Sequence, residues 1–355
     1  MGFLWEMSSL ERLRKCRKVR RSEYVEVRGR RDGGGPAGYA GLCTCGSVWA
    51  CPVDSRRINA ERALEIGLAV GLAHHEGYGV VFSTFTMRHR REHLLTESWA
   101  ACQKAWSRMT NTKAFRKEKE RYGLVGYLLV PEVTDGVNGW HVHYHVLFFF
   151  RSPITEAEAD ALHDRLFERW SSGLVDAGYP APLKVGQDHR LVTDGTCREI
   201  AEYLSKSGDP ARAGAAAKRE QSARGIGLEL TGSAGKVARK LHGTYTPWAI
   251  LDAAMEGDMD FIERWWAWEQ GSKGKRQVRW SQGLRESLGL SRERTDEEII
   301  AEQEGDEALF YFSAEQWSNV VQEPRLLGQI LDEVERGGVV GARKFLDAVG
   351  ISYSE

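Results

Sequence analysis

The sequence predicts an α+β fold built on an antiparallel sheet. Three observations support this prediction: a β-branched and aromatic run at 79–87, a pair of apolar runs at 124–133 and 140–150 separated by turn residues, and helical apolar stripes that follow the first run and the pair. Strands favour β-branched and aromatic residues, whereas amphipathic helices place apolar residues three or four positions apart. The predicted order is strand, helix, strand, strand, helix and strand.

The first helix and the hairpin account for residues 95–150. From 95 onward, apolar positions recur at spacings of four and three: Trp99, Cys102, Trp106 and Met109. The next two strands flank the dipeptides Asp135-Gly136 and Asn138-Gly139, which are typical of hairpin turns. We therefore expect these strands to pair through a short loop.

The second helix begins at a capping box, in which Thr155 is followed three residues later by Glu158. Its buried stripe comprises Ala159, Leu162, Leu166 and Trp170. A short strand is expected near 183–192, and one more helix at about 196–206. The order β-α-β-β-α-β is the split unit that builds a ferredoxin-like antiparallel sheet with helices on one face.

Composition predicts a globular protein without a membrane segment. The chain has 355 residues, of which 42% are hydrophobic and 28% charged, so it is long enough to bury a core. Its longest apolar run, around 142–150, is far shorter than the roughly 20 residues that cross a bilayer. The N-terminus lacks a secretory-signal pattern, and clustered cysteines suit a reducing compartment. We expect a cytoplasmic protein.

Charge is unevenly distributed along the chain. The net charge is −1, yet residues 291–355 carry 6 basic and 15 acidic side chains, a net −9, which leaves +8 on the first 290 residues. Basic residues gather at 1–31 and 272–285. A basic body with an acidic tail favours contacts with phosphate groups.

Three histidines occupy alternate positions of the second hairpin strand, in WHVHYHVLFFF at 140–150. Since successive side chains of a strand point to opposite faces, His141, His143 and His145 share one face. Burying three imidazoles without partners is costly, and a divalent cation gives them a common partner. The pattern predicts a metal site. Imidazole and carboxylate ligands with open positions suit Mg²⁺ or Mn²⁺, and Zn²⁺ fits as well.

Glu132 is a candidate further ligand because it lies across the hairpin from these histidines. A register that pairs it with His141 or His143 brings its carboxylate to the same cation. A slip by one residue points the carboxylate to the opposite face. The sequence leaves both registers open.

The segment CREIAEYLSKSG at 197–208 places Glu199, Tyr203 and Lys206 on one helical face, at spacings of four and three. A phenol with a pKa of about 10 needs nearby positive charge to act as a nucleophile at neutral pH, and Lys206 offers that charge. A carboxylate one turn away can take a proton from water. The same residues are also ordinary on an amphipathic helix, so spacing alone leaves a packing role open.

Three strings together resemble the motifs of plasmid rolling-circle replication initiators, which belong to the HUH endonucleases (named for His-hydrophobic-His). They are TFTM at 84–87, EVTDGVNGWHVHYHVLF at 132–148 and EIAEYLSKS at 199–207. The actinobacterial branch is the most similar, and the likeness extends through CGSVWACPVDSRRI, TPWAILDAAMEGDMDFIERWW and VRWSQGLRESLGL. The resemblance covers most of 10–300.

The resemblance implies roles for individual residues. His143 and His145 match the paired metal ligands, and His141 and Glu132 are candidate additional ligands. Tyr203 matches the nucleophile that attacks single-stranded DNA at the double-strand origin, leaving a 5′-phosphotyrosyl bond and a 3′-hydroxyl that primes synthesis. Glu199 matches the carboxylate that activates water for termination, and Lys206 matches a basic residue that steadies the phosphate.

A cysteine cluster near the N-terminus resembles a small zinc-binding element of these initiators, which usually carries a Cys-Pro-x-Cys pair. Asp54 stands where the second cysteine of that pair is expected. Since zinc accepts carboxylate oxygen, the candidate ligands of a structural Zn²⁺ are Cys16, Cys45, Cys51 and either Cys43 or Asp54. Loss of the site, leaving free thiols, stays open.

The expected organisation has four parts: a basic N-terminal segment with the cysteine cluster at 1–74, an HUH nicking domain at 75–210, a basic linker or DNA-contacting arm at 211–244, and a mostly helical region with an acidic tail at 245–355. The implied activity is metal-assisted, strand-specific nicking and rejoining of DNA. Its implied partners are single-stranded and origin double-stranded DNA, and the family suggests a host helicase and DNA polymerase.

Two alternatives share these motifs. An HUH mobilisation relaxase or single-strand transposase would use the same chemistry, but such chains commonly differ in motif order or carry paired tyrosines, and the spacing of Glu199 and Tyr203 favours the initiator. A non-catalytic origin-binding protein would lack motif residues, whereas here every one is present. The sequence does not identify the origin bases, the native metal or the oligomeric state.

Overall fold

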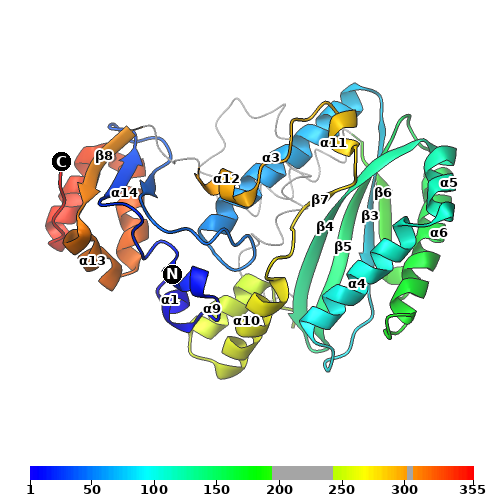
Figure 1. Cartoon of the computed structure of the whole chain (residues 1–355), viewed down its shortest axis with the longest axis horizontal. Helices are drawn as coiled ribbons and strands as arrows, with labels where there is room; N and C mark the ends of the chain where they lie inside the picture. Colours follow the sequence, from blue (N-terminus) through cyan, green and yellow to red (C-terminus); the bar gives the residue numbers. More distant parts are fainter. Residues whose placement is uncertain (194–242, 302–306) are drawn as a thin grey trace. The chain divides into compact units, whose positions relative to one another are not determined.

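The residues that this computed structural model describes are 1–193, 243–301 and 307–355. They form two compact units, and Figure 1 labels most of their helices and strands. The central unit comprises Ser55–Glu293, and the terminal unit combines Met1–Asp54 with Arg294–Glu355. Each unit has its own sheet and its own hydrophobic core.

A five-stranded sheet with the order β6-β3-β5-β4-β7 forms the centre of the central unit, and its neighbouring strands are all antiparallel. Its strands are β3 (Gly79–Thr86), β4 (Leu124–Gly136), β5 (Gly139–Phe150), β6 (Asp188–Leu191) and β7 (Arg279–Trp280). The first four are the strands that the sequence predicts. The mixed α+β class with an antiparallel sheet is thereby confirmed.

The helices of the central unit include the two predicted between these strands, α4 (Leu95–Thr110) and α6 (Glu156–Val175). The others are α3 (Asp54–His75), α5 (Lys113–Tyr122), α9 (Pro247–Met255), α10 (Met259–Ser272), α11 (Leu284–Ser287) and the 3₁₀ turn Lys184–Gly186. At the start of α6, Thr155 Oγ1 accepts a hydrogen bond from the Glu158 amide at 3.3 Å, and Glu158 Oε2 accepts one from the Thr155 amide at 3.0 Å. The predicted capping box is confirmed.

The two faces of the central sheet pack against different helices. Tyr144 and Phe148 of β5 contact Trp106 of α4, with ring centroids 6.0 and 6.4 Å apart. On the opposite face, Leu147 and Phe149 pack in one cluster with apolar residues of α3. Full burial of one phenylalanine stabilises a fold by about 1.5–3 kcal/mol, so both layers hold the sheet. Helices α4 and α6 lie on one face of the sheet, as expected. The opposite face is not left open, because apolar residues of α3, a helix that precedes the first predicted strand, pack against it.

The terminal unit is built from both ends of the described chain. Its elements are α1 (Gly2–Met7), α2 (Glu11–Lys15), β1 (Val25–Gly29), β2 (Gly38–Ala40), α12 (Asp296–Ala301), β8 (Glu307–Phe312), α13 (Ala314–Gln322) and α14 (Arg325–Val349). Its antiparallel sheet has the order β2-β1-β8, so β1 pairs with a strand nearly 300 residues later. Within the described ranges of both units, no helix is long and apolar enough to cross a membrane.

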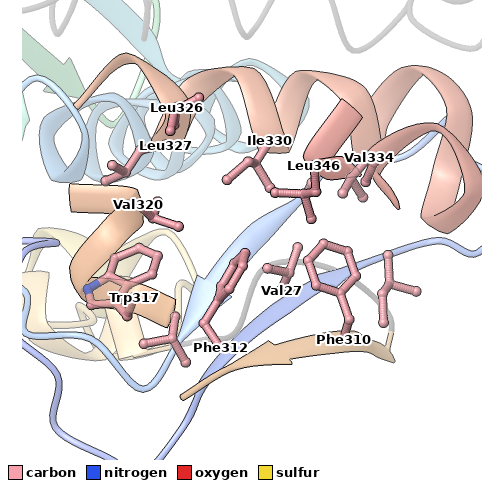
Figure 2. Packing of buried hydrophobic residues seen from close by; sticks show 14 of the residues in the cluster. Val27, Phe310, Phe312, Trp317, Val320, Leu326, Leu327, Ile330, Val334 and Leu346 are labelled. Carbon is pink, nitrogen blue, oxygen red and sulfur yellow. The ribbon is translucent and has the colours of Figure 1, made fainter. Parts of the chain in front are cut away.

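The core of the terminal unit lies between its sheet and its last two helices. Figure 2 shows Phe310 and Phe312 of β8 pointing toward Ile330 and Val334 of α14. Trp317 of α13 lies in the same core, and its indole nitrogen donates a hydrogen bond to the Lys18 carbonyl at 2.9 Å. The predicted acidic tail is therefore part of a packed unit, with its charged side chains flanking an apolar face.

Candidate metal centres

The hairpin of β4 and β5 brings a carboxylate to the predicted histidine face. The register sets Glu132 directly opposite His143, and the hairpin closes at the pair Gly136 and Gly139. Gly139 has a φ of 81°, a left-handed conformation that glycine adopts without steric strain. This turn selects one of the two registers that the sequence leaves open, and Glu132 shares the face of His141, His143 and His145.

Three ligand atoms converge at this point. Glu132 Oε2 lies 2.8 Å from His143 Nε2 and 2.7 Å from His145 Nε2. One ligand atom from each of these side chains lies within 4.8 Å of the other two. All three side chains are half-buried, so the group is shielded by the sheet and still open to solvent on one side. Glu132, His143 and His145 are called the histidine centre below.

Electrostatics keep the carboxylate of the histidine centre ionised. Burial alone would raise the pKa of Glu132, but the adjacent imidazoles of His143 and His145 hold this pKa well below its usual range. The site therefore presents a negative oxygen between two imidazole nitrogens at neutral pH. This charge favours a cation at the same place.

Neighbouring side chains orient the ring of His145. Thr84 of β3 lies opposite His145, and its Oγ1 is 3.2 Å from His145 Nδ1. The hydrogen bond at Nδ1 directs Nε2 toward Glu132, and Phe82 stacks on the same ring with centroids 5.4 Å apart. This positioning role of Thr84 cannot be predicted from its local sequence, because it depends on the register between β3 and β5.

His141 lies beside the histidine centre and outside the converging group. Its ring centroid is 5.0 Å from that of His143 and 4.9 Å from that of His89, on which it stacks. Burial lowers the pKa of His141 to about 3, and the nearby His143 and His89 add to this effect. The imidazole is neutral at pH 7, so His141 remains a candidate ligand that the structure does not bring to Glu132.

The donor set of the histidine centre fits a divalent cation. His143 Nδ1 is buried and has no hydrogen-bond partner among the described residues, which leaves Nε2 as its only engaged atom. Two imidazole nitrogens and one carboxylate oxygen on paired strands are ligand types of Mn²⁺, Zn²⁺ and Mg²⁺ sites. Three protein ligands leave coordination positions for solvent or a phosphate oxygen, which is the arrangement of a reactive site.

The predicted catalytic helix cannot be placed beside this centre. Tyr203, Glu199 and Lys206 all fall within 194–242, outside the described residues. Their roles remain predictions.

A second group of donors lies in the terminal unit. Cys16, Cys45, Cys51 and Asp54 are buried, and their ligand atoms lie within 4.8 Å of one another. The Cys16 and Cys51 sulfurs are 3.7 Å apart, and Asp54 Oδ2 is 3.3 Å from the Cys45 sulfur. Cys43 is half-buried and outside this group, so the structure brings Asp54 to the fourth position. These four residues are called the cysteine cluster below.

The backbone holds Asp54 in the cysteine cluster. Asp54 begins α3, and its Oδ2 accepts hydrogen bonds from the amides of Cys45 at 2.9 Å and Gly46 at 3.0 Å. Arg17 donates to the other carboxylate oxygen at 3.1 Å. The aspartate is therefore anchored on both oxygens and cannot rotate away from the sulfurs.

The cysteine cluster fits a closed, four-ligand metal site. Burial would raise the pKa of the Cys51 thiol, but hydrogen bonds with Cys16 and Cys45 hold it well below its usual range. The pKa values of the Cys16 and Cys45 thiols are raised, so without a metal the group holds one thiolate beside two thiols. The thiolate is the form of cysteine that binds metal. The sulfur separation of 3.7 Å is close to the roughly 3.8 Å edge of a tetrahedral site with Zn–S bonds of about 2.3 Å.

Comparisons with known proteins agree with the motifs. "Protein rep" of Streptomyces lividans is 28% identical over 309 residues, covering 70% of this chain and 64% of that protein. The "Neomycin resistance protein" of Streptomyces cyanogenus is 30% identical over 142 residues, covering 33% of this chain and 32% of that protein. The chain thus spans less than two thirds of either relative, and no solved structure matches it significantly. Residues 42–318 match the family described as replication protein, and the chain belongs to that family.

Proposed function

We propose that this replication protein initiates rolling-circle replication by nicking and rejoining origin DNA through Tyr203, beside a divalent cation. The observation that carries the proposal is the histidine centre, which lies within the 42–318 segment shared with replication proteins. The centre has open coordination positions, and the motif that contains Tyr203 follows it along the chain.

The histidine centre would activate the scissile phosphate through a bound cation. His143, His145 and Glu132 hold Mg²⁺ or Mn²⁺, and His141 is a candidate further ligand. When bound, the cation offsets the negative charge that develops on the non-bridging oxygens of the scissile phosphate. β4 and β5 are paired along their whole length, so this ferredoxin-like sheet keeps the ligand atoms in place before DNA arrives.

Tyr203 supplies the nucleophile. Its phenolic oxygen forms a bond to phosphorus while the bond from phosphorus to the 3′ oxygen breaks, which leaves a 5′-phosphotyrosyl link and a free 3′-hydroxyl. The positive charge of Lys206 favours loss of the phenol proton. In the terminating cleavage, Glu199 takes a proton from water, and the released hydroxide attacks a second phosphodiester in place of the tyrosine.

The nicking domain is assigned to 75–210, with the N-terminal segment 1–74, the basic arm 211–244 and the C-terminal region 245–355 flanking it. Single-stranded DNA and origin double-stranded DNA are its substrates, and a host helicase and DNA polymerase act on the nicked product. The net +8 of the first 290 residues supports phosphate contacts over this part of the chain.

The cysteine cluster is assigned a structural Zn²⁺ with Cys16, Cys45, Cys51 and Asp54 as ligands. Four buried donors at tetrahedral spacing support this assignment, because structural zinc sites are closed by protein ligands. Cys43 keeps no role in the site.

Covalent capture of DNA tests the proposed function. The full chain is incubated with a single-stranded origin oligonucleotide and Mn²⁺, and SDS-resistant adducts are counted on a denaturing gel. Tyr203→Phe should give no adduct. The matched control is Tyr24→Phe, which changes an exposed tyrosine directly before β1 and should give as much adduct as wild type. Equal adduct in Tyr203→Phe would refute the assignment, and DNA footprinting without any cleavage would favour a non-catalytic origin-binding protein.

The relaxase and transposase alternatives are separated by the terminating cleavage. In a single-tyrosine initiator, Glu199→Ala should nick at the wild-type rate and accumulate unterminated product on a plasmid template. Unimpaired termination in this variant would favour a relaxase or transposase.

A further inference from the structure

A polar cavity lies on the face of the central sheet opposite to the histidine centre. Its volume is about 150 Å³, and it is lined by residues of α4, β4, β5, the segment after α10, and β7. The lining residues whose side chains carry hydrogen-bonding or charged groups are Trp99, Gln103, Tyr144, Lys275, Arg276 and Arg279. No carboxylate lines it. All of these residues belong to the central unit.

Tyr144 gives this cavity an unsatisfied hydrogen-bond donor. Its side chain is only 1% exposed, and its hydroxyl has no hydrogen-bond partner among the described residues. Leaving a buried hydroxyl unpaired is energetically costly, so such groups normally have a hydrogen-bond partner. Because Tyr144 lines the cavity, an occupant of the cavity can accept this hydrogen bond.

The charges around Tyr144 are positive. Arg279 lines the same cavity as Tyr144. Burial raises the pKa of the Tyr144 phenol, Cys102 adds to that rise, and Arg279 opposes it. Arg279 forms no ion pair within the described part of the chain, and β7 fixes its backbone opposite Leu129 of β4. Lys275 reaches the same place, with Nζ 3.4 Å from Gln103 Oε1.

Leu129 and Pro131 form apolar walls of the cavity. Such walls lower the local dielectric, which strengthens attraction between these cations and an anion. A tetrahedral oxyanion can accept from several donors that approach from different directions, and arginine matches phosphate geometry in a bidentate manner. The volume suits one phosphate group with a few waters.

We propose that this cavity is a phosphate-binding site, in which Arg279 and Lys275 hold the oxyanion and the Tyr144 hydroxyl donates to it. The site is separate from the proposed nicking chemistry, because Tyr144 projects from β5 away from His143 and His145. The phosphate group can belong to free inorganic phosphate or to DNA.

Calorimetric titration of the full chain with inorganic phosphate, at constant ionic strength in chloride, tests this site. One phosphate per chain should bind, Arg279→Gln should weaken binding at least about tenfold, and Tyr144→Phe should weaken it about threefold. Arg276→Gln, at an exposed lining position that can be changed without disturbing the core, should weaken binding severalfold. Lys273→Gln is the matched control, since it removes an exposed positive charge outside the lining and should stay within about twofold.

Competition identifies the source of the phosphate. Displacement of inorganic phosphate by an unphosphorylated single-stranded oligonucleotide would assign the site to a DNA backbone phosphate, and displacement only by a 5′-phosphorylated one would assign it to a terminal monoester. Retention of phosphate against both would assign it to the free ion. No saturable binding by wild type, or equal weakening by Lys273→Gln and Arg279→Gln, would overturn the proposal. The result is independent of Tyr203, because phosphate binding requires no cleavage.

Discussion

The histidine centre and the cysteine cluster differ in their exposure to solvent. The histidine centre has three half-buried donors, Glu132, His143 and His145, on one hairpin. The cysteine cluster has four buried donors, drawn from positions 16 to 54, with its aspartate bound by backbone amides. An open site can admit a substrate oxygen, whereas a closed one can only hold the chain together. This difference in solvent access supports the proposed roles, which are chemistry at the histidine centre and stability at the cysteine cluster.

The two sites also differ in what they prefer to bind. Thiolate sulfur selects soft or borderline metals such as zinc, and imidazole with carboxylate accepts harder cations such as Mn²⁺ and Mg²⁺. Removing one metal ligand should therefore change a different property at each site. Stability should fall at the cysteine cluster, and reaction rate should fall at the histidine centre.

The largest expected effect is the loss of the Zn²⁺ proposed for the cysteine cluster. Cys51→Ser removes the buried sulfur that sits 3.7 Å from that of Cys16, and a structural zinc site contributes folding free energy directly. We expect loss of bound zinc, measured by elemental analysis, and a melting transition of the terminal unit lowered by more than about 10 °C.

Cys43→Ser is the matched control, because Cys43 lies in the same segment but outside the converging group. It should retain the zinc and the wild-type melting curve. Loss of zinc in Cys43→Ser would assign the fourth ligand to Cys43 in place of Asp54, and retention of zinc in Cys51→Ser would remove Cys51 from the site.

The next effect concerns rate at the histidine centre. His143→Ala removes one ligand and the imidazole opposite Glu132, so we expect Mn²⁺-dependent nicking of the origin oligonucleotide to fall about 10³-fold, or about 4 kcal/mol. Because the centre is open, the melting temperature should change little. His75→Ala, at an exposed histidine of α3, is the control and should nick normally. A lowered melting temperature with an unchanged nicking rate in His143→Ala would show that the centre is structural.

Much of the histidine centre is predictable from local pattern. Strand alternation alone places three histidines on one face, and the turn dipeptides predict the hairpin. The register is not predictable, because two turn dipeptides compete, and the structure closes the hairpin between Gly136 and Gly139. Thr84 depends on a third strand and leaves no local signal.

The terminal unit is largely beyond local pattern. Pairing of β1 with β8 joins residues nearly 300 positions apart, and nothing in either strand specifies the other. The charge of residues 291–355 predicts a solvated acidic tail. In the structure, Phe310, Trp317 and Ile330 of this stretch pack together in the core of the terminal unit. The cysteine cluster is predictable in membership, yet the choice of Asp54 over Cys43 requires the backbone amides of Cys45 and Gly46.

A buried histidine of α6, the helix that packs on the other face of the central sheet, extends the comparison to pH. Burial lowers the pKa of His163 to about 4, and the neighbouring His189 adds to this, with ring centroids 4.2 Å apart. Between pH 6.5 and 4 the unfolded chain binds a proton at this residue that the folded chain does not, so the free energy of unfolding falls as pH falls. The loss at pH 4.5 is about 2 kcal/mol, and it stops growing below pH 4.

His141 contributes in the same direction, because its pKa is also lowered, to about 3. We therefore compare His163→Gln with wild type by urea unfolding at pH 7 and pH 4.5, and expect the variant to lose about 2 kcal/mol less over this range. His75→Gln, at an exposed position, should follow wild type. Identical pH dependence in wild type and His163→Gln would show that His163 titrates normally.

The smallest effect tests whether the histidine centre is positioned by its neighbours. Thr84→Val keeps the shape of the side chain and removes the hydroxyl 3.2 Å from His145 Nδ1. Loss of such a hydrogen bond to a ligand ring typically weakens metal affinity 10- to 100-fold, and we expect about tenfold here because Phe82 still stacks on the ring. Mn²⁺ binding is measured by calorimetry, with Thr134→Val on β4 as a control that should stay within about twofold. Thr84→Ser should restore affinity, since it returns the hydroxyl. Equal affinity in Thr84→Val and wild type would mean that the β4–β5 register alone orients His145, and the contrast between an open centre and an anchored cluster would then become sharper.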